Sequence, residues 1–232
     1  VEDAQTGDVD GVVADNAARA VVLDDGASLN YMSSANQSLP LPWITNNGNG
    51  ADGGTLSTTT DASAGSAAAQ MTGRTTTGSG PAVLVDGATT ATLTLGSGGS
   101  LASATGGAEL TSVDGSTVNN GGTITGNAGG PIVTAFGGPL TFNNSGTFTG
   151  TIGFTGGNDV LVNTGTYRAL FNQSFGAGND RFTNSGTFLV LPGTTTAGTV
   201  ALTGLEAFNN SGLIDLRNGH AGDVLSTSGT FT

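Results

Sequence analysis

One seven-residue signature recurs six times in the second half of this chain, and no other feature constrains the fold as strongly. Its consensus is an apolar residue, any residue, Asn, any residue, Gly, Thr and a second apolar or aromatic residue. The copies occupy 118–124, 142–148, 161–167, 182–188, 208–214 and 225–231, and their glycines are 24, 19, 21, 26 and 17 residues apart. A period near twenty residues, built from short apolar segments and Gly/Asn turns, is typical of one coil of a β-solenoid.

The asparagine of the signature predicts how the coils are held together. Apolar, Asn, Gly and aromatic positions alternate, so in one extended strand they would all point to the same side. An inward Asn needs hydrogen-bond partners, and stacked coils can supply them if each amide donates to one neighbour and accepts from the other. We also expect left-handed backbone at these Asn and Gly corners. The expected ladder is Asn120, Asn144, Asn163, Asn184 and Asn210, ending where Thr227 replaces Asn in the last copy.

Composition separates this chain from disordered proteins. Gly supplies 41 of 232 residues and charged residues only 9%, whereas ordinary domains have about 25% charged residues. Disordered chains are usually highly charged and poor in apolar residues. Here the mean hydropathy is slightly positive, and regularly spaced Phe, Leu, Ile and Val can fill a narrow continuous core.

The net charge disfavours two classes of partner. The chain has five arginines, no lysine and a net charge of −12, which disfavours nucleic acid and anionic membrane surfaces because both require clustered positive charge. The absence of cysteine excludes disulfides and thiol chemistry, and no run of 18 apolar residues predicts a membrane-spanning helix. The composition favours an exported bacterial surface protein. The acidic start without Met suggests a removed signal peptide or an excised piece.

The chain divides into a less regular part, 1–81, and a regular repeat region, 82–232. Segments 20–29 and 83–95 each predict a strand, an Asp-Gly turn and a second strand. Between them, 46–80 is low in complexity and predicts either loosely patterned coils or a long surface loop. We expect Tyr31 and Trp43, which precede this segment, to cover the core of the first coil. Ten or eleven coils would make a rod of roughly 50 Å. Because the chain stops inside a signature, we expect either a continuation or pairing with another copy.

The segments Asn-Asn-Ser-Gly-Thr-Phe (143–148), Thr-Asn-Ser-Gly-Thr-Phe (183–188) and Asn-Asn-Ser-Gly-Leu-Ile-Asp-Leu (209–216), with the ending 211–231, resemble the passenger regions of type V autotransporters. The closest likeness is to Gly/Thr/Asn-rich passengers of alphaproteobacteria, and it covers about 82–232. The resemblance implies an all-β, right-handed parallel β-helix displayed outside the cell. It implies contact with the outer membrane only through a barrel domain outside this sequence, and no shared active site.

Two segments carry possible calcium chemistry. Phe-Thr-Gly-Gly-Asn-Asp (154–159) and Phe-Gly-Ala-Gly-Asn-Asp (175–180) resemble the calcium-binding nonapeptide of RTX proteins, and oxygen ligands from Asp159 and Asp180 would suit Ca²⁺. RTX arrays repeat every nine residues, whereas these segments are 21 apart. We therefore interpret them as Asn-Asp turns between coils and expect no metal or other cofactor.

Other catalytic patterns are weak. The Gly-x-Gly-x-x-Gly at 48–53 has no following helix to bind a dinucleotide. His220 lies near Asp215 and Asp223, but no Gly-x-Ser-x-Gly accompanies it, so we interpret it as a solvated turn residue. Arg168 and Arg181 could face Asp159 and Asp180 across coils, as a surface ion pair or as part of a sugar-cleaving site.

Three functions remain. The first is a non-enzymatic surface-displayed passenger that acts as an adhesin or structural stalk, with a host or neighbouring cell surface as partner. The second is a structural subunit that assembles end to end with its own copies into a filament or surface layer. The third is a carbohydrate-active β-helix enzyme or spike, which the scarcity of ionisable residues disfavours.

Overall fold

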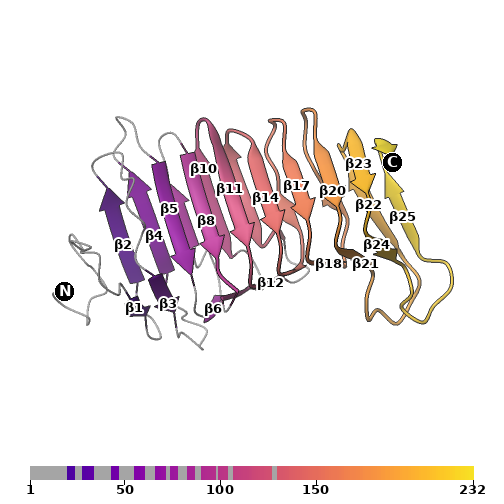
Figure 1. Cartoon of the computed structure of the whole chain (residues 1–232), viewed down its shortest axis with the longest axis horizontal. Helices are drawn as coiled ribbons and strands as arrows, with labels where there is room; N and C mark the ends of the chain where they lie inside the picture. Colours follow the sequence, from indigo (N-terminus) through magenta and orange to yellow (C-terminus); the bar gives the residue numbers. More distant parts are fainter. Residues whose placement is uncertain are drawn as a thin grey trace.

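The described part of the chain folds into three β-sheets wrapped around one narrow core, with a fourth short sheet at the C-terminal end (Figure 1). The computed structural model describes residues 90–232 except 98, 104–106 and 127–129, together with the backbone of seven strands between 20 and 86. All the elements in this part of the chain are β-strands. Every strand pair joins two parallel strands from successive coils, as in the register Leu161↔Phe182. The predicted solenoid is therefore confirmed.

The longest wall is a ten-stranded sheet to which each coil contributes one strand. Its strands are β1 (Ala20–Leu23), β3 (Trp43–Asn46), β5 (Ser66–Met71), β8 (Thr90–Leu95), β11 (Gly115–Asn120), β14 (Leu140–Asn144), β17 (Val160–Asn163), β20 (Arg181–Asn184), β23 (Ala207–Asn210) and β26 (Thr230–Phe231). At about 4.8 Å per step, ten stacked strands make a rod of roughly 45 Å.

Two further walls complete each coil. The seven-stranded sheet contains β6 (Arg74–Thr77), β9 (Ser100–Ser103), β12 (Thr123–Gly126), β15 (Thr147–Thr149), β18 (Thr166–Ala169), β21 (Thr187–Val190) and β24 (Leu213–Asp215). The six-stranded sheet contains β2 (Ser28–Ser33), β4 (Thr55–Thr60), β7 (Val83–Asp86), β10 (Ala108–Ser112), β13 (Val133–Gly137) and β16 (Ile152–Gly153), and the three-stranded sheet β19 (Gln173–Ser174), β22 (Thr199–Thr203) and β25 (Val224–Thr227).

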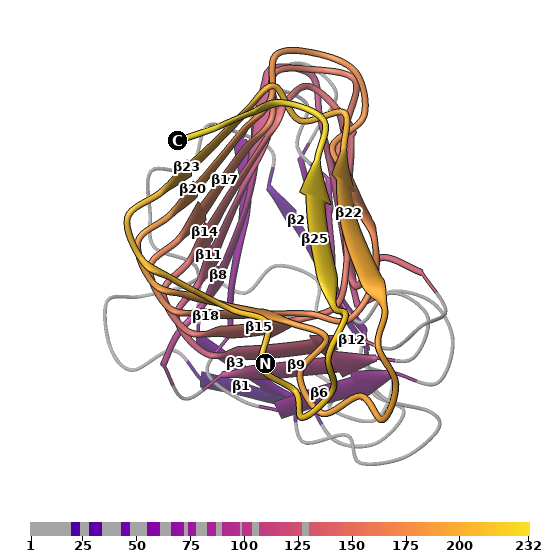
Figure 2. The same ribbon diagram turned by 90° about the vertical axis from the view of Figure 1, so that its right-hand side faces the viewer.

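Figure 2 shows the triangular cross-section of the coils from the C-terminal end. The chain passes from the ten-stranded sheet on the left to the seven-stranded sheet below, and then to the three-stranded sheet on the right, while it advances toward the viewer. This counter-clockwise path toward the viewer makes the β-helix right-handed, as expected. Six coils follow one another from β8 to β25.

The N-terminal third contributes strands to the same sheets. The Ala-rich segment 66–71 forms β5, which pairs residue by residue with β8, and β4 and β6 lie within 46–80. The strands described within 46–80 therefore belong to coils of the same stack. The acidic segment 1–19, the glycine motif at 48–53 and the side chains of Tyr31 and Trp43 lie outside the described residues.

Side-chain alternation places the core as period-two strands require. In β8 the threonines are partly exposed, whereas Ala91, Leu93 and Leu95 are buried, and the same alternation runs through β11, β14 and β17. One continuous cluster of buried apolar residues follows from Ala91 to Phe208. The core is a single column because each coil adds only a few inward side chains to the coil before it.

Candidate functional site

The five predicted asparagines lie one above another where the ten-stranded sheet turns into the seven-stranded sheet. Four hydrogen bonds join them in one direction, because the Nδ2 of each amide donates to the Oδ1 of the next. The donor–acceptor distance is 2.7 Å for Asn120 to Asn144 and 2.6 Å for the three pairs that follow. Each of the first four also donates to a main-chain carbonyl at the start of the next coil's strand, namely that of Thr147, Thr166, Thr187 or Leu213.

The two ends of the ladder have different causes. It begins at Asn120 because Leu95 occupies the paired position one coil earlier, and the free Oδ1 of Asn120 accepts a hydrogen bond from the backbone N–H of Gly122 at 3.1 Å. It ends at Asn210, whose Nδ2 donates to the carbonyl of Gly212 at 3.1 Å. The interior members, with both neighbours present, are the fully stacked part of the ladder.

The sixth signature copy turns a different corner from the other five. Strand β25 pairs with β22, which places Thr227 opposite Leu202, and β26 pairs with β23, which places Phe231 opposite Phe208. The prediction that Thr227 ends the Asn ladder is therefore wrong. The sequence pattern misleads because both corners require a glycine followed by a strand, and the spacing of the copies cannot tell one corner from the other.

Close stacking, and not backbone handedness, requires the signature glycine. A Cβ added to Gly165 would lie 2.2 Å from the carbonyl oxygen of Gly146, and one added to Gly186 would lie 2.2 Å from that of Gly165. None of these glycines has a positive φ, and among the described residues Leu191 is the only non-glycine that does. The expected left-handed corners are therefore wrong. The signature instead bends from one sheet into the next, with its glycine packed directly against the backbone of the preceding coil.

Aromatic rings form a second ladder inside the core. Phe148 contacts Tyr167 with ring centroids 5.0 Å apart, and Tyr167 contacts Phe188 at 5.1 Å, both edge to face. Phe182 and Phe208 stack in parallel at 4.5 Å. Such pairs add stabilisation beyond the burial of their area. Burial raises the pKa of the Tyr167 hydroxyl, which donates to the carbonyl of Gly150 at 3.4 Å.

Carboxylates form a third column, at the corner where each coil enters the ten-stranded sheet. The carboxylate of Asp159 accepts hydrogen bonds from the backbone N–H of Leu140 and of Thr155. Asp180 Oδ1 accepts from the N–H of Asp159 at 2.7 Å, and Glu206 Oε2 accepts from the N–H of Asp180 at 2.6 Å. Each of these side chains therefore caps the backbone of the coil before it, and we call Asp159, Asp180 and Glu206 the carboxylate column.

The positions of Asp159 and Asp180 in the carboxylate column do not fit the calcium hypothesis or the ion-pair hypothesis. Asp159 and Asp180 are fully buried, whereas Arg181 is exposed on the opposite side of β20. Among the described residues the one ion pair joins Arg217 to Asp215, so neither Arg168 nor Arg181 pairs with these aspartates. No group of three or more His, Cys, Asp or Glu in this part of the chain has the arrangement of a metal site.

Gln173 closes a break between two sheets, and no sequence motif predicts it. The six-stranded sheet ends at β16 and the three-stranded sheet begins at β19, so Ile152 has no strand partner on that side. The buried side-chain amide of Gln173 accepts from the N–H of Ile152 and donates to its carbonyl, both at 2.8 Å. It thus replaces the hydrogen bonds of a missing strand. A polar residue in an otherwise apolar inward position is the only signal that the sequence offered.

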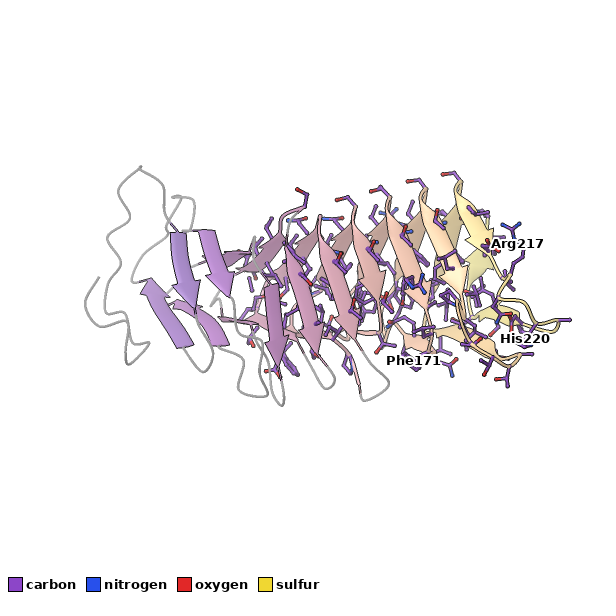
Figure 3. The ribbon with its side chains drawn as sticks, turned by 90° about the horizontal axis from the view of Figure 1, so that it is seen from below. Phe171, Arg217 and His220 are labelled. Atoms are coloured by element: carbon purple, nitrogen blue, oxygen red, sulfur yellow. The ribbon has the colours of Figure 1, made fainter. Side chains whose placement is uncertain are left out.

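His220 lies on a pair of adjoining loops at the C-terminal end. Loops 191–198 and 216–223 are joined by hydrogen bonds from Asn218 Nδ2 to Thr194 Oγ1 at 2.9 Å and from the N–H of Gly198 to Asp223 Oδ1 at 3.0 Å. Figure 3 shows His220 and Arg217 at the outer edge of this end. The ring of His220 is exposed and has no aspartate partner within the described coils.

His220 is therefore an exposed loop residue, in agreement with its interpretation as a solvated turn residue. Asp215 instead accepts two hydrogen bonds from the Arg217 side chain, both at 2.8 Å, and one from its backbone N–H at 2.9 Å. The hydrogen bonds from the guanidinium lower the pKa of Asp215 to about 2. The two loops are held by amide and carboxylate contacts of their own, and those contacts give no nucleophile a base.

Comparison with known proteins adds no assignment: no family model, no curated protein and no solved structure matches the chain. Within the described residues there is no helix long and apolar enough to cross a membrane.

Proposed function

We propose that this chain is a non-enzymatic rod that serves as an adhesin or structural stalk on a bacterial cell surface. The observation that carries the proposal is the use of its buried polar side chains. Hydrogen bonds to a neighbouring coil are made by the Asn ladder, by the carboxylate column and by Gln173. These buried polar side chains therefore hold the coils together along one axis. A structure built from such contacts is suited to be a stiff, elongated rod.

The composition and the signature support the cell-surface location of this proposal. An acidic, cysteine-free and Gly/Thr/Asn-rich chain with repeats that resemble autotransporter passengers is suited to display outside the cell. Solenoids present long, regular faces on which contacts can be repeated. The partner on this proposal is a host or neighbouring cell surface.

Protease treatment of intact cells tests the proposed location. Cells that produce the natural protein are treated with a non-penetrating protease, and the chain is followed with an antibody against 82–232, with a periplasmic protein as control. The proposal expects loss of the epitope while the control protein survives. Survival of the epitope until the cells are lysed would refute surface display. Electron microscopy of the purified chain then separates single rods of about 45 Å from longer assemblies.

One observation favours end-to-end assembly as a second candidate function. The last coil exposes Leu213, Val224 and Phe231 by 49, 46 and 55%, and β24, β25 and β26 are each the last strand of their sheet. A second copy could cover this surface, as could a following coil of a longer polypeptide. Sedimentation of the chain over a range of concentrations distinguishes them. Self-association that Phe231→Glu abolishes supports assembly, and a monomer at all concentrations refutes it.

A further inference from the structure

The carboxylate column has one feature that coil stacking leaves unexplained. Asp180 is fully buried, and its Oδ2 has no hydrogen-bond partner although its Oδ1 caps the N–H of Asp159. In Asp159, by contrast, both oxygens accept hydrogen bonds, Oδ1 from Leu140 and from the Thr155 hydroxyl and Oδ2 from the Thr155 N–H. An ionised oxygen without a donor is costly to bury, so Asp180 is suited to carry a hydrogen atom.

Two titratable side chains face Asp180, and both are acidic. Asp159 lies against it on the preceding coil and Glu206 on the following coil. The ion pair of the described coils, Arg217 with Asp215, lies on the C-terminal loops and not in this column. Desolvation by burial raises the pKa of Asp180, and the charges of Asp159 and Glu206 raise it further. Burial also raises the pKa of Asp159.

We propose that Asp180 is an acid-strengthened lock between coils: on acidification its carboxylate takes up a proton at Oδ2. Protonation removes one of the stacked negative charges and, with it, the cost of burying an ionised oxygen that has no donor. The contacts that cap the backbone remain, because Oδ1 still accepts from the N–H of Asp159. This inference does not depend on the proposed surface function.

The direction of the pH dependence follows from linkage. Because the folded-state pKa of Asp180 lies above the ordinary Asp value of 3.8, the folded chain binds more protons than the unfolded chain between these two values. The stabilisation is fully present below the unfolded pKa and is lost as pH rises through the folded pKa. In that window each unit of acidification lowers the unfolded-to-folded ratio by up to about tenfold per proton.

Urea unfolding of the full chain at a series of pH values tests the lock. The wild type should become more resistant as pH falls from about 7 toward about 4. Asp180→Asn mimics the protonated side chain, so it should resist urea better than the wild type at neutral pH and show a flatter pH profile. Asp180→Ala also removes the hydrogen bond to the N–H of Asp159, so this variant should resist urea less well than the wild type at every pH. Asp215→Asn is the matched control, because that carboxylate titrates outside this window, and it should keep the wild-type profile.

Several outcomes would overturn the lock. The first is a wild-type chain whose resistance to urea falls steadily on acidification. The second is an Asp180→Asn variant with the wild-type pH profile. The third is stabilisation of the wild type at neutral pH by Ca²⁺ alone, if Asp180→Asn abolishes it. The last result would make the column a cation site. If the variant does not fold, the ¹³Cγ resonance of Asp180 in the wild type gives the answer. A titration midpoint at or below 3.8, the ordinary Asp value, would refute the proposal, and one above it supports the proposal.

Discussion

Two adjacent asparagines in β14 allow the Asn ladder to be tested with one residue type on two faces of one strand. Asn144 points inward and is 2% exposed, whereas Asn143 points outward and is half-buried. Asn144 donates to Asn163 Oδ1 at 2.6 Å and accepts from Asn120 Nδ2 at 2.7 Å. Asn143 makes one side-chain hydrogen bond, to Asn119 Oδ1 at 2.9 Å. Replacement of each by Ala therefore removes contacts of different burial from the same strand.

The structure sets the expected magnitudes. Asn144→Ala leaves the Oδ1 of Asn163 without a donor and one amide hydrogen of Asn120 without an acceptor, both in buried positions. Each unsatisfied buried group costs about 1–3 kcal/mol, so the free energy of unfolding should fall by about 2–6 kcal/mol. Asn143→Ala removes one partly exposed hydrogen bond and should cost about 0.5–1.5 kcal/mol.

Equilibrium urea unfolding followed by far-ultraviolet circular dichroism measures both variants against the wild type. Because coils of a solenoid can unfold in stages, the slope of the transition must be compared as well as its midpoint. The reasoning is refuted if the two variants lose the same free energy within about 0.5 kcal/mol. Equal losses would mean that the ladder contributes no more than an outward hydrogen bond, and that backbone pairing alone aligns the coils.

Three further predictions follow from other contacts. Gly165→Ala should prevent native stacking, since its Cβ would meet a backbone carbonyl 2.2 Å away, whereas Gly156→Ala, with nothing within 4 Å, should leave the thermal midpoint unchanged. Gln173→Ala should cost about 2–6 kcal/mol in urea unfolding because it leaves a buried N–H and a buried C=O unpaired, and a loss below about 1 kcal/mol would show that water replaces the amide. The carboxyl resonance of Asp215 should titrate near 2, and Arg217→Ala should return that midpoint to the ordinary range; because the folded pKa is lowered, the stabilisation from this pair is lost only as pH falls toward 2.

The Asn ladder is the most predictable part of the candidate site. An Asn that recurs at the same inward position in five successive coils has no partner within its own strand, so the identical residue one coil away is the natural partner. The carboxylate column was harder to predict. Asp159 and Asp180 belong to a recognisable Asn-Asp turn pattern, but Glu206 belongs to no motif, and its contact with the N–H of Asp180 joins residues that are 26 positions apart along the chain.

What the sequence determined by itself is the coil: the alternation of side chains, the stack of parallel strands and the five asparagines that join them. These follow from local periodicity and from the need of a buried amide for partners. Only the tertiary structure decided which corner the sixth copy occupies, that Gln173 replaces a missing strand and that Asp180 points inward with one oxygen unpaired. The physical reason is that coil length varies, from 19 residues between Asn144 and Asn163 to 29 between Gln173 and Leu202. The residue that lies above another is therefore chosen by packing and backbone pairing across the stack, and spacing along the chain does not reveal it.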